Sequence, residues 1–166
     1  MNAPNPKAVF DTVILLQAVT NPDGPSWAAL AQADSGRIQI VAGDATLKEA
    51  EDVLARPSVR KRFATLDDRT AAEFLGVYRG MAEIHVNVPK TVSLERNHKD
   101  EPFLDLAVES GATYLVTRDK DMLDLMADPD FTAKYPGLKI VNPVELLREL
   151  APPIRLEPER ERGLQP

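Results

Sequence analysis

The sequence predicts an α/β domain of three layers, α/β/α, around a mostly parallel sheet of four or five strands. Short apolar runs rich in β-branched residues alternate along the chain with longer segments of helical periodicity, which is typical of strands joined by crossover helices. The clearest example is residues 100–121, where an amphipathic helix, a glycine turn and an apolar strand follow one another.

In that unit, an apolar face at helical spacing starts after Asp100 and Glu101, and Gly111 is placed to end the helix. Residues 113–117 form a short apolar strand of the kind covered on both faces. Asp119 lies just beyond its carboxyl end, where open parallel sheets bind their ligands.

The remaining elements follow from the same two periodicities and from turn residues. Ser26 is expected to cap the second helix, Asp67 the fifth, and Pro143 suits the first turn of the last. Residues 128–137 are expected to be a loop. The expected strands are residues 8–10, 38–41, 84–88, 113–117 and 138–141. The expected helices are residues 13–18, 26–35, 46–54, 59–63, 67–81, 101–110, 122–126 and 143–150.

Length and composition limit the function classes. The 166 residues suit one domain, residues 1–150, followed by a proline-rich, charged tail, 151–166, that is disordered or binds a partner. The absence of cysteine excludes disulfides, thiolate metal sites and cysteine nucleophiles, and two histidines disfavour a zinc site. The net charge of −6 argues against a non-specific nucleic-acid coat. With no signal core or membrane-length apolar run, a cytoplasmic protein is expected.

Four acids are expected at one edge of the sheet. Asp11 and Asp119 end strands, whereas Glu49 and Asp100 lie near the starts of helices. Carboxylates that share a small volume repel one another unless cations neutralise them, and oxygen-only ligands suit Mg²⁺ or Mn²⁺. Such a site binds a scissile phosphate and lowers the pKa of a coordinated water.

This arrangement resembles the PIN-domain ribonuclease family, in particular the VapC-like toxins of toxin–antitoxin pairs. The resemblance spans residues 8–150 and rests on the segments 9–12, 47–57 and 100–121. It implies a metal-dependent endoribonuclease that acts on RNA, is restrained by a small antitoxin protein and forms a homodimer. It implies that the metal-binding and catalytic acids are Asp11, Glu49, Asp100 and Asp119. The residues expected to support them are Thr12, Thr117, Glu101 and Asp121.

One position departs from the family pattern. The family usually has Asp-Thr-Asn at the first acid, and here Val13 replaces the Asn. This keeps open a catalytically impaired PIN-like binding module. Another alternative is a haloacid-dehalogenase-type phosphohydrolase, whose chemistry needs a second Asp two residues after the first. Val13 occupies that position too.

Simpler explanations exist for single residues. Asp11 alone suits a helix N-cap, Glu49 suits a solvated first-turn acid, and Asp100 suits the helix dipole. The basic run at residues 56–62 is explained by a solvated helix face as well as by RNA phosphates. Aromatic residues such as Trp27 are expected in the core or in dimer contacts.

Overall fold

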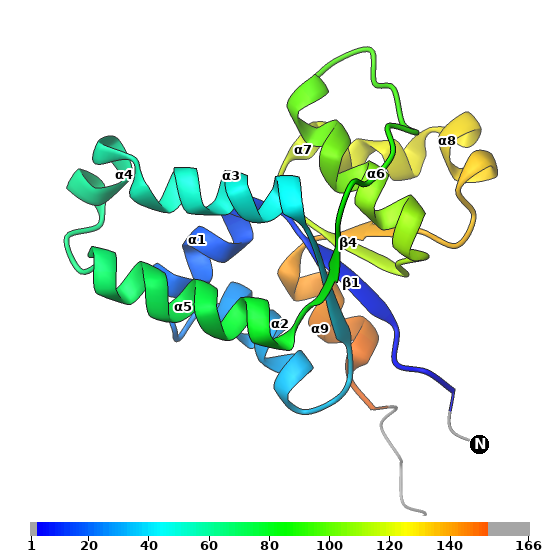
Figure 1. Cartoon of the computed structure of the whole chain (residues 1–166). Coiled ribbons are helices and arrows are strands. Elements are labelled where there is room, and N and C mark those ends of the chain that lie inside the picture. The colour runs from blue at the N-terminus through cyan, green and yellow to red at the C-terminus, as the bar shows by residue number, and fades with distance from the viewer. Residues whose placement is uncertain (1–2, 153–166) are drawn as a thin grey trace, which may run out of the picture.

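The computed structural model describes residues 3–152, whose five strands form one fully parallel sheet (Figure 1). The strand order is β3-β2-β1-β4-β5, so β1 is central. The predicted three-layer α/β/α architecture is therefore confirmed. The strands are β1 (Lys7–Phe10), β2 (Gln39–Gly43), β3 (Glu83–His85), β4 (Tyr114–Val116) and β5 (Lys139–Val141).

Alternate residues of the central strand face opposite layers. Ala8 and Phe10 belong to one buried cluster, whereas Val9 belongs to the other. The register places Val9 beside Val41 on β2 and beside Leu115 on β4. Because both faces are covered by helices, the inner strands are apolar except for Lys7 and Gln39 at the starts of β1 and β2.

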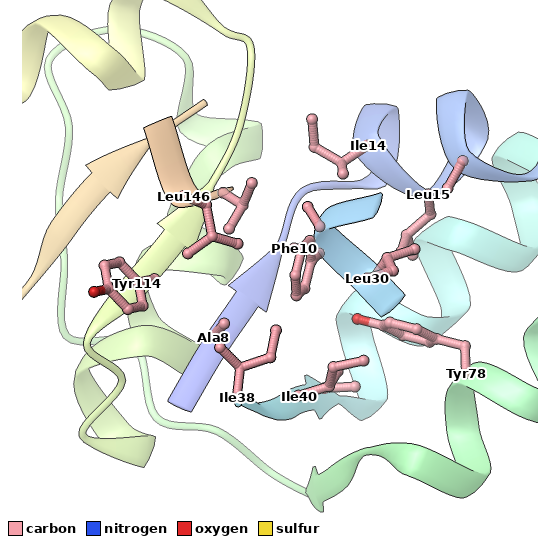
Figure 2. Close-up of a cluster of buried hydrophobic side chains, with 14 of the residues drawn as sticks. Ala8, Phe10, Ile14, Leu15, Leu30, Ile38, Ile40, Tyr78, Tyr114 and Leu146 are labelled. Atoms are coloured by element: carbon pink, nitrogen blue, oxygen red, sulfur yellow. The ribbon is translucent and has the colours of Figure 1, made fainter. Parts of the chain in front are cut away.

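The first face is covered by α1 (Thr12–Thr20), α2 (Pro25–Asp34) and α9 (Pro143–Leu150). Figure 2 shows Phe10 of β1 with Ile14 of α1 and Leu30 of α2, and Leu146 of α9 near Tyr114. Removing these side chains from water stabilises the fold, at about 25 cal/mol for each Å² of apolar surface buried.

The second face is covered mainly by α6 (Glu101–Ser110), which follows a short 3-10 turn, η1 (His98–Asp100). Phe103, Leu104 and Ala107 of α6 pack against Val9 and Leu115 of the sheet. The predicted C-terminal glycine is confirmed, since Gly111 has a φ of 67° in the left-handed region. Shorter helices complete this layer: α7 (Lys120–Leu123), η2 (Asp124–Ala127) and α8 (Pro129–Lys134).

Three helices form a lateral extension next to β2 and β3. They are α3 (Asp44–Ala55), α4 (Pro57–Arg62) and α5 (Asp68–Met81), and α3 and α5 lie side by side (Figure 1). A small core of Leu54, Leu66 and Ala71 joins them. The predicted cap is confirmed, because the Asp67 carboxylate accepts the Thr70 N–H over 2.7 Å.

Three local predictions were wrong. The expected loop at 128–137 contains α8, because the Asp128 carboxylate caps it and Pro129 occupies its first turn. The second helix begins at Pro25, and Ser26 is buried and donates to the Gln17 side chain instead of capping. The third strand ends at His85, because Asn87 adopts a positive φ of 53°.

The predicted tail, residues 151–166, lies almost wholly outside the described residues. Among residues 3–152, the helices are all too short or too polar to cross a lipid bilayer.

Candidate active site

Two of the predicted residues lie side by side at neighbouring strand ends. Phe10 of β1 pairs with Val116 of β4, so Asp11 and Thr117 follow at the same edge of the sheet. The Thr117 hydroxyl is fully buried and donates to Asp11 Oδ2 over 2.8 Å. The Asp11 carboxylate makes no capping hydrogen bond to α1. Asp11 is nevertheless the N-cap residue of α1, and the backbone of Thr12 and Val13 lies close enough to its carboxyl to lower the pKa.

Asp119 lies two residues beyond Thr117 and contacts it directly. The Asp119 N–H donates to Thr117 Oγ1 over 3.0 Å. Asp119 also caps α7, since its Oδ1 accepts the N–H groups of Asp121 and Met122 over 2.8 and 3.2 Å. The Thr117 hydroxyl thus links the Asp11 carboxylate to the Asp119 backbone. The second carboxylate oxygen of Asp119, Oδ2, takes no part in the cap of α7.

Glu49 reaches the site from the lateral helices. It lies in the second turn of α3, and its Oε2 accepts the Thr12 hydroxyl over 3.0 Å. Thr12 is itself buried at the start of α1, one residue after Asp11. A side chain on α1 therefore orients an acid that is 37 positions away in the sequence.

Asp100 ends the 3-10 turn before α6. Its Oδ2 atom is buried and accepts no hydrogen bond from the residues that the structure describes. A buried polar oxygen without a donor costs free energy, so such an atom in a folded protein calls for an explanation.

The four acids are linked electrostatically. Burial raises the pKa of Asp11, and the negative charge of Asp119 raises it further. Burial also raises the pKa of Glu49, and there the negative charge of Asp11 adds to the effect. Burial also raises the pKa of Asp100, to about 6, and Asp119, Asp11 and Glu49 add to the effect. Hydrogen bonds from Thr117 to Asp11 and from Thr12 to Glu49 act in the opposite direction. The structure therefore brings all four predicted acids into one group.

Two other predicted residues lie beside this group and have separate contacts. Glu101 accepts the Leu94 N–H over 3.0 Å and contacts His98 Nδ1 over 2.8 Å, so it holds the segment that leads to α6. The Asp121 carboxylate accepts a hydrogen bond from the Asn97 side-chain amide. Both residues fix the local chain around Asp100 and Asp119.

Sequence reasoning missed Asp105, which is only 3% exposed on α6. Its Oδ1 accepts the N–H groups of Thr91 and Val92 over 2.9 and 2.7 Å, and so holds the irregular segment after β3. The available signal was one acid inside the apolar face of a predicted helix. Such an acid must find donors when it is buried.

A cleft of about 530 Å³ opens beside Asp100. The segment 92–97 forms one wall, and α7, η2 and α8 form the other. Its acidic lining residues are Glu95, Asp100, Asp121, Asp124, Asp128 and Asp130. Its basic lining residues are Arg96 and Lys134. Most of the charged residues that line the cleft are therefore acidic.

The donors of the four-acid group match a hard divalent cation. All are carboxylate oxygens, which Mg²⁺ and Mn²⁺ prefer, and the unpartnered Asp100 Oδ2 is free to bind one. Within residues 3–152, no three acidic or histidine side chains converge closely enough to enclose an ion as they stand. Carboxylates repel one another, which favours larger distances between them, and a bound cation offsets this repulsion.

The raised pKa of Asp100 predicts how the stability of the metal-free protein depends on pH. Its folded-state pKa of about 6 exceeds the ordinary value of 3.8. The folded protein therefore loses stability as pH rises through this range, because the unfolded state releases the proton first. We expect a loss of about 1 kcal/mol between about pH 4 and pH 7, after allowing for solvent screening of a partly exposed group.

Urea unfolding in the presence of a chelator, at pH 5 and pH 7, measures this effect. The Asp100→Asn variant has no carboxyl to titrate and should lose less stability than the wild type over the same interval. An identical pH dependence in the two proteins would show that Asp100 titrates normally.

Comparison with known proteins agrees with this geometry. The profile of the family described as PIN domain matches residues 7–121. No curated protein matches the chain. Among solved structures, the fold is similar to that of VapBC2 from Rickettsia felis, which was crystallised bound to a DNA fragment from its promoter. That likeness has a TM-score of 0.53 and 14% sequence identity, and covers 82% of this chain and 98% of the other. Since the profile match covers more than half of the sequence and includes all four acids, the chain belongs to the PIN domain family.

Proposed function

We propose that this protein is a Mg²⁺- or Mn²⁺-dependent endoribonuclease that hydrolyses phosphodiester bonds in cytoplasmic RNA. Membership of the PIN domain family supports a nuclease. The observation that carries the proposal is the group formed by Asp11, Glu49, Asp100 and Asp119. These four carboxylates come from distant parts of the chain and influence one another's charge at one end of the sheet.

Each acid has a defined task in this proposal. Asp11 and Asp119 would bind a cation from the strand ends, and the Thr117 hydroxyl holds the Asp11 carboxylate and the Asp119 backbone N–H. Glu49 and Asp100 would approach it from α3 and from the start of α6. A bound divalent cation polarises the scissile phosphate and lowers the pKa of an attacking water. The protein residues hold and orient the groups.

Val13 bears on the alternative of a non-catalytic binding module. Its side chain is 46% exposed two positions after Asp11, so it presents an apolar surface beside the acids. It does not displace any of the four carboxylates. Loss of the polar contact that the family's Asn makes is compatible with a slower enzyme. Activity measurements separate a slow enzyme from a non-catalytic binding module.

We further propose that the protein is the toxin of a toxin–antitoxin pair and forms a homodimer. VapBC2, whose fold is similar, supports a small antitoxin as the partner. Apolar side chains on α2 and α5 support a protein contact there, since the Trp27 and Phe74 rings lie 6.5 Å apart and Val77 is 63% exposed.

The test is cleavage of mixed-sequence single-stranded RNA by the purified protein. We expect cleavage with Mn²⁺ or Mg²⁺, none with excess chelator, and recovery when the metal is restored. A small phosphomonoester should not be hydrolysed, which separates a nuclease from a haloacid-dehalogenase-type phosphohydrolase. Intact RNA under all metal conditions would contradict the proposal and favour the binding module.

A further inference from the structure

We propose that Arg56 and Lys99 form a phosphate clamp on two sides of the four-acid group, so that RNA enters over the junction of α3 and α4. This inference rests on the proposed ribonuclease function and adds the path of the substrate. The clamp would bind phosphates next to the scissile one, which the acids alone would repel.

The position of Arg56 follows from the periodicity of α3. It lies seven residues after Glu49, which is two turns of an α-helix, so the two residues share one face. Arg56 is exposed where α3 ends and α4 begins. Within residues 3–152, its guanidinium group makes no hydrogen bond or ion pair. It is therefore available to bind a phosphate with both of its terminal nitrogens.

Lys99 reaches the same acids from the segment before α6. It directly precedes Asp100 in the 3-10 turn before α6, and its side chain is exposed. In the described part of the chain, its ammonium group has no salt-bridge partner. Arg56 and Lys99 both lie close enough to Glu49 to lower the pKa of its carboxyl, and Lys99 does the same for Asp100.

Two other basic residues near these acids are already engaged. Arg60 donates through Nε to the Leu54 carbonyl and through Nη1 to Asp68 over 2.9 Å. Lys90 lies 3.7 Å from Glu101. Within the basic run at residues 56–62, Arg56 lies near Glu49, and its guanidinium group has no hydrogen-bond or ion-pair partner in the described part of the chain.

The cleft between the segment 92–97 and α7, η2 and α8 disfavours RNA. The 530 Å³ cleft beside Asp100 has six acidic residues and two basic ones in its lining, so it repels phosphates. Figure 1 shows α4 and α8 on opposite sides of the molecule, with the start of α6 between them. A strand that avoids the cleft passes over α3 and continues toward the exposed Lys61 and Arg62 of α4.

The experiment compares Arg56→Gln and Lys99→Gln with the wild type. Arg148→Gln on α9 and Lys134→Gln in the acidic cleft are the matched controls, since each removes one exposed charge elsewhere. RNA affinity is measured by fluorescence anisotropy of a labelled mixed-sequence single strand in chelator, which keeps the RNA intact. Cleavage with Mn²⁺ is measured as KM and kcat, each over a range of salt concentrations.

Each clamp variant should bind RNA about fivefold more weakly, and the slope of log affinity against log salt should fall by about 0.7 for each phosphate that the variant no longer neutralises. KM should rise while kcat changes less, and the increase in Tm on adding Mn²⁺ should persist because no carboxylate is removed. The controls should match the wild type.

Two results would overturn the clamp and leave the proposed function intact. Wild-type affinity and salt slope in both variants would show that Arg56 and Lys99 do not contact RNA, even if the wild type cleaves it. Equal losses in the controls would show a diffuse effect of net charge. Failure of the wild type to cleave RNA with any metal would instead overturn the proposed function, and the clamp with it.

Discussion

Asp119→Asn should reduce RNA cleavage by about 10²-fold or more while the protein remains folded. A neutral amide oxygen is a much poorer ligand for Mg²⁺ or Mn²⁺ than a carboxylate, because these hard ions favour anionic oxygen. The increase in Tm that Mn²⁺ gives the wild type should therefore shrink in the variant.

The structure explains why the fold should survive. The Asp119 cap of α7 uses only Oδ1, which accepts two N–H groups, and Asn caps helices about as well as Asp. The substitution also removes one negative charge that raises the pKa of Asp11 and of Asp100. At neutral pH, the metal-free variant should hold or gain stability.

Asp128→Asn is a matched control for this prediction. Asp128 caps α8 in the same way, through Oδ1 to the N–H groups of Asp130 and Phe131. It lines the acidic cleft and is not among the main causes of the raised pKa of Asp11, Glu49 or Asp100. Asp128→Asn should change neither cleavage nor the response to Mn²⁺. The same result for Asp119→Asn would show that Asp119 serves only as a helix cap.

The sheet could be predicted because its signal is local. Residues 113–117 are apolar and bounded by Gly111 and Asp119, so strand and strand end are visible in one stretch of sequence. Alternation with helices then requires parallel pairing. The same reasoning placed Asp11 and Asp119 at one edge, since carboxyl ends of parallel strands lie together.

The contacts that orient the acids could not be predicted in this way. The bond from Thr12 to Glu49 joins α1 to α3 and depends on how far the lateral helices tilt toward the sheet. Asp105 was missed for a related reason. Its donors are two N–H groups of an irregular segment, and no periodicity predicts the path of such a segment.

The error at α8 has a different origin. Asp128 and Pro129 are a standard helix start, but the helix has only six residues. One apolar side chain, Phe131, is buried by it, so the segment carries too little periodicity to outweigh its turn residues. Whether so short a helix forms depends mainly on tertiary contacts, here the cap and the packing of one aromatic ring.

Thr117→Val should have the second largest effect, because it removes a hydroxyl that serves two acids. Thr117 is fully buried, and Val has nearly the same shape. The change leaves Asp11 Oδ2 without its donor and the Asp119 N–H without its acceptor. We expect the free energy of unfolding to fall by about 1–3 kcal/mol at neutral pH.

This loss should depend on pH in a predictable direction. The hydroxyl lowers the pKa of Asp11, which burial raises. Its removal raises the folded-state pKa further, so the penalty applies to the charged carboxylate and shrinks as pH falls and Asp11 takes up a proton. Urea unfolding of both proteins at pH 5 and pH 7 measures the difference.

Thr117→Ser provides the control, since it keeps the hydroxyl and removes only a methyl group. A small cavity costs about 1 kcal/mol or less at any pH, whereas cleavage should stay near that of the wild type. Thr117→Val should cleave more slowly, because Asp11 and Asp119 lose the group that positions them relative to each other. If Val and Ser variants lose equal stability at both pH values and cleave RNA equally well, the hydroxyl is only a packing group. In that case, the two carboxylates are positioned by the strand ends alone.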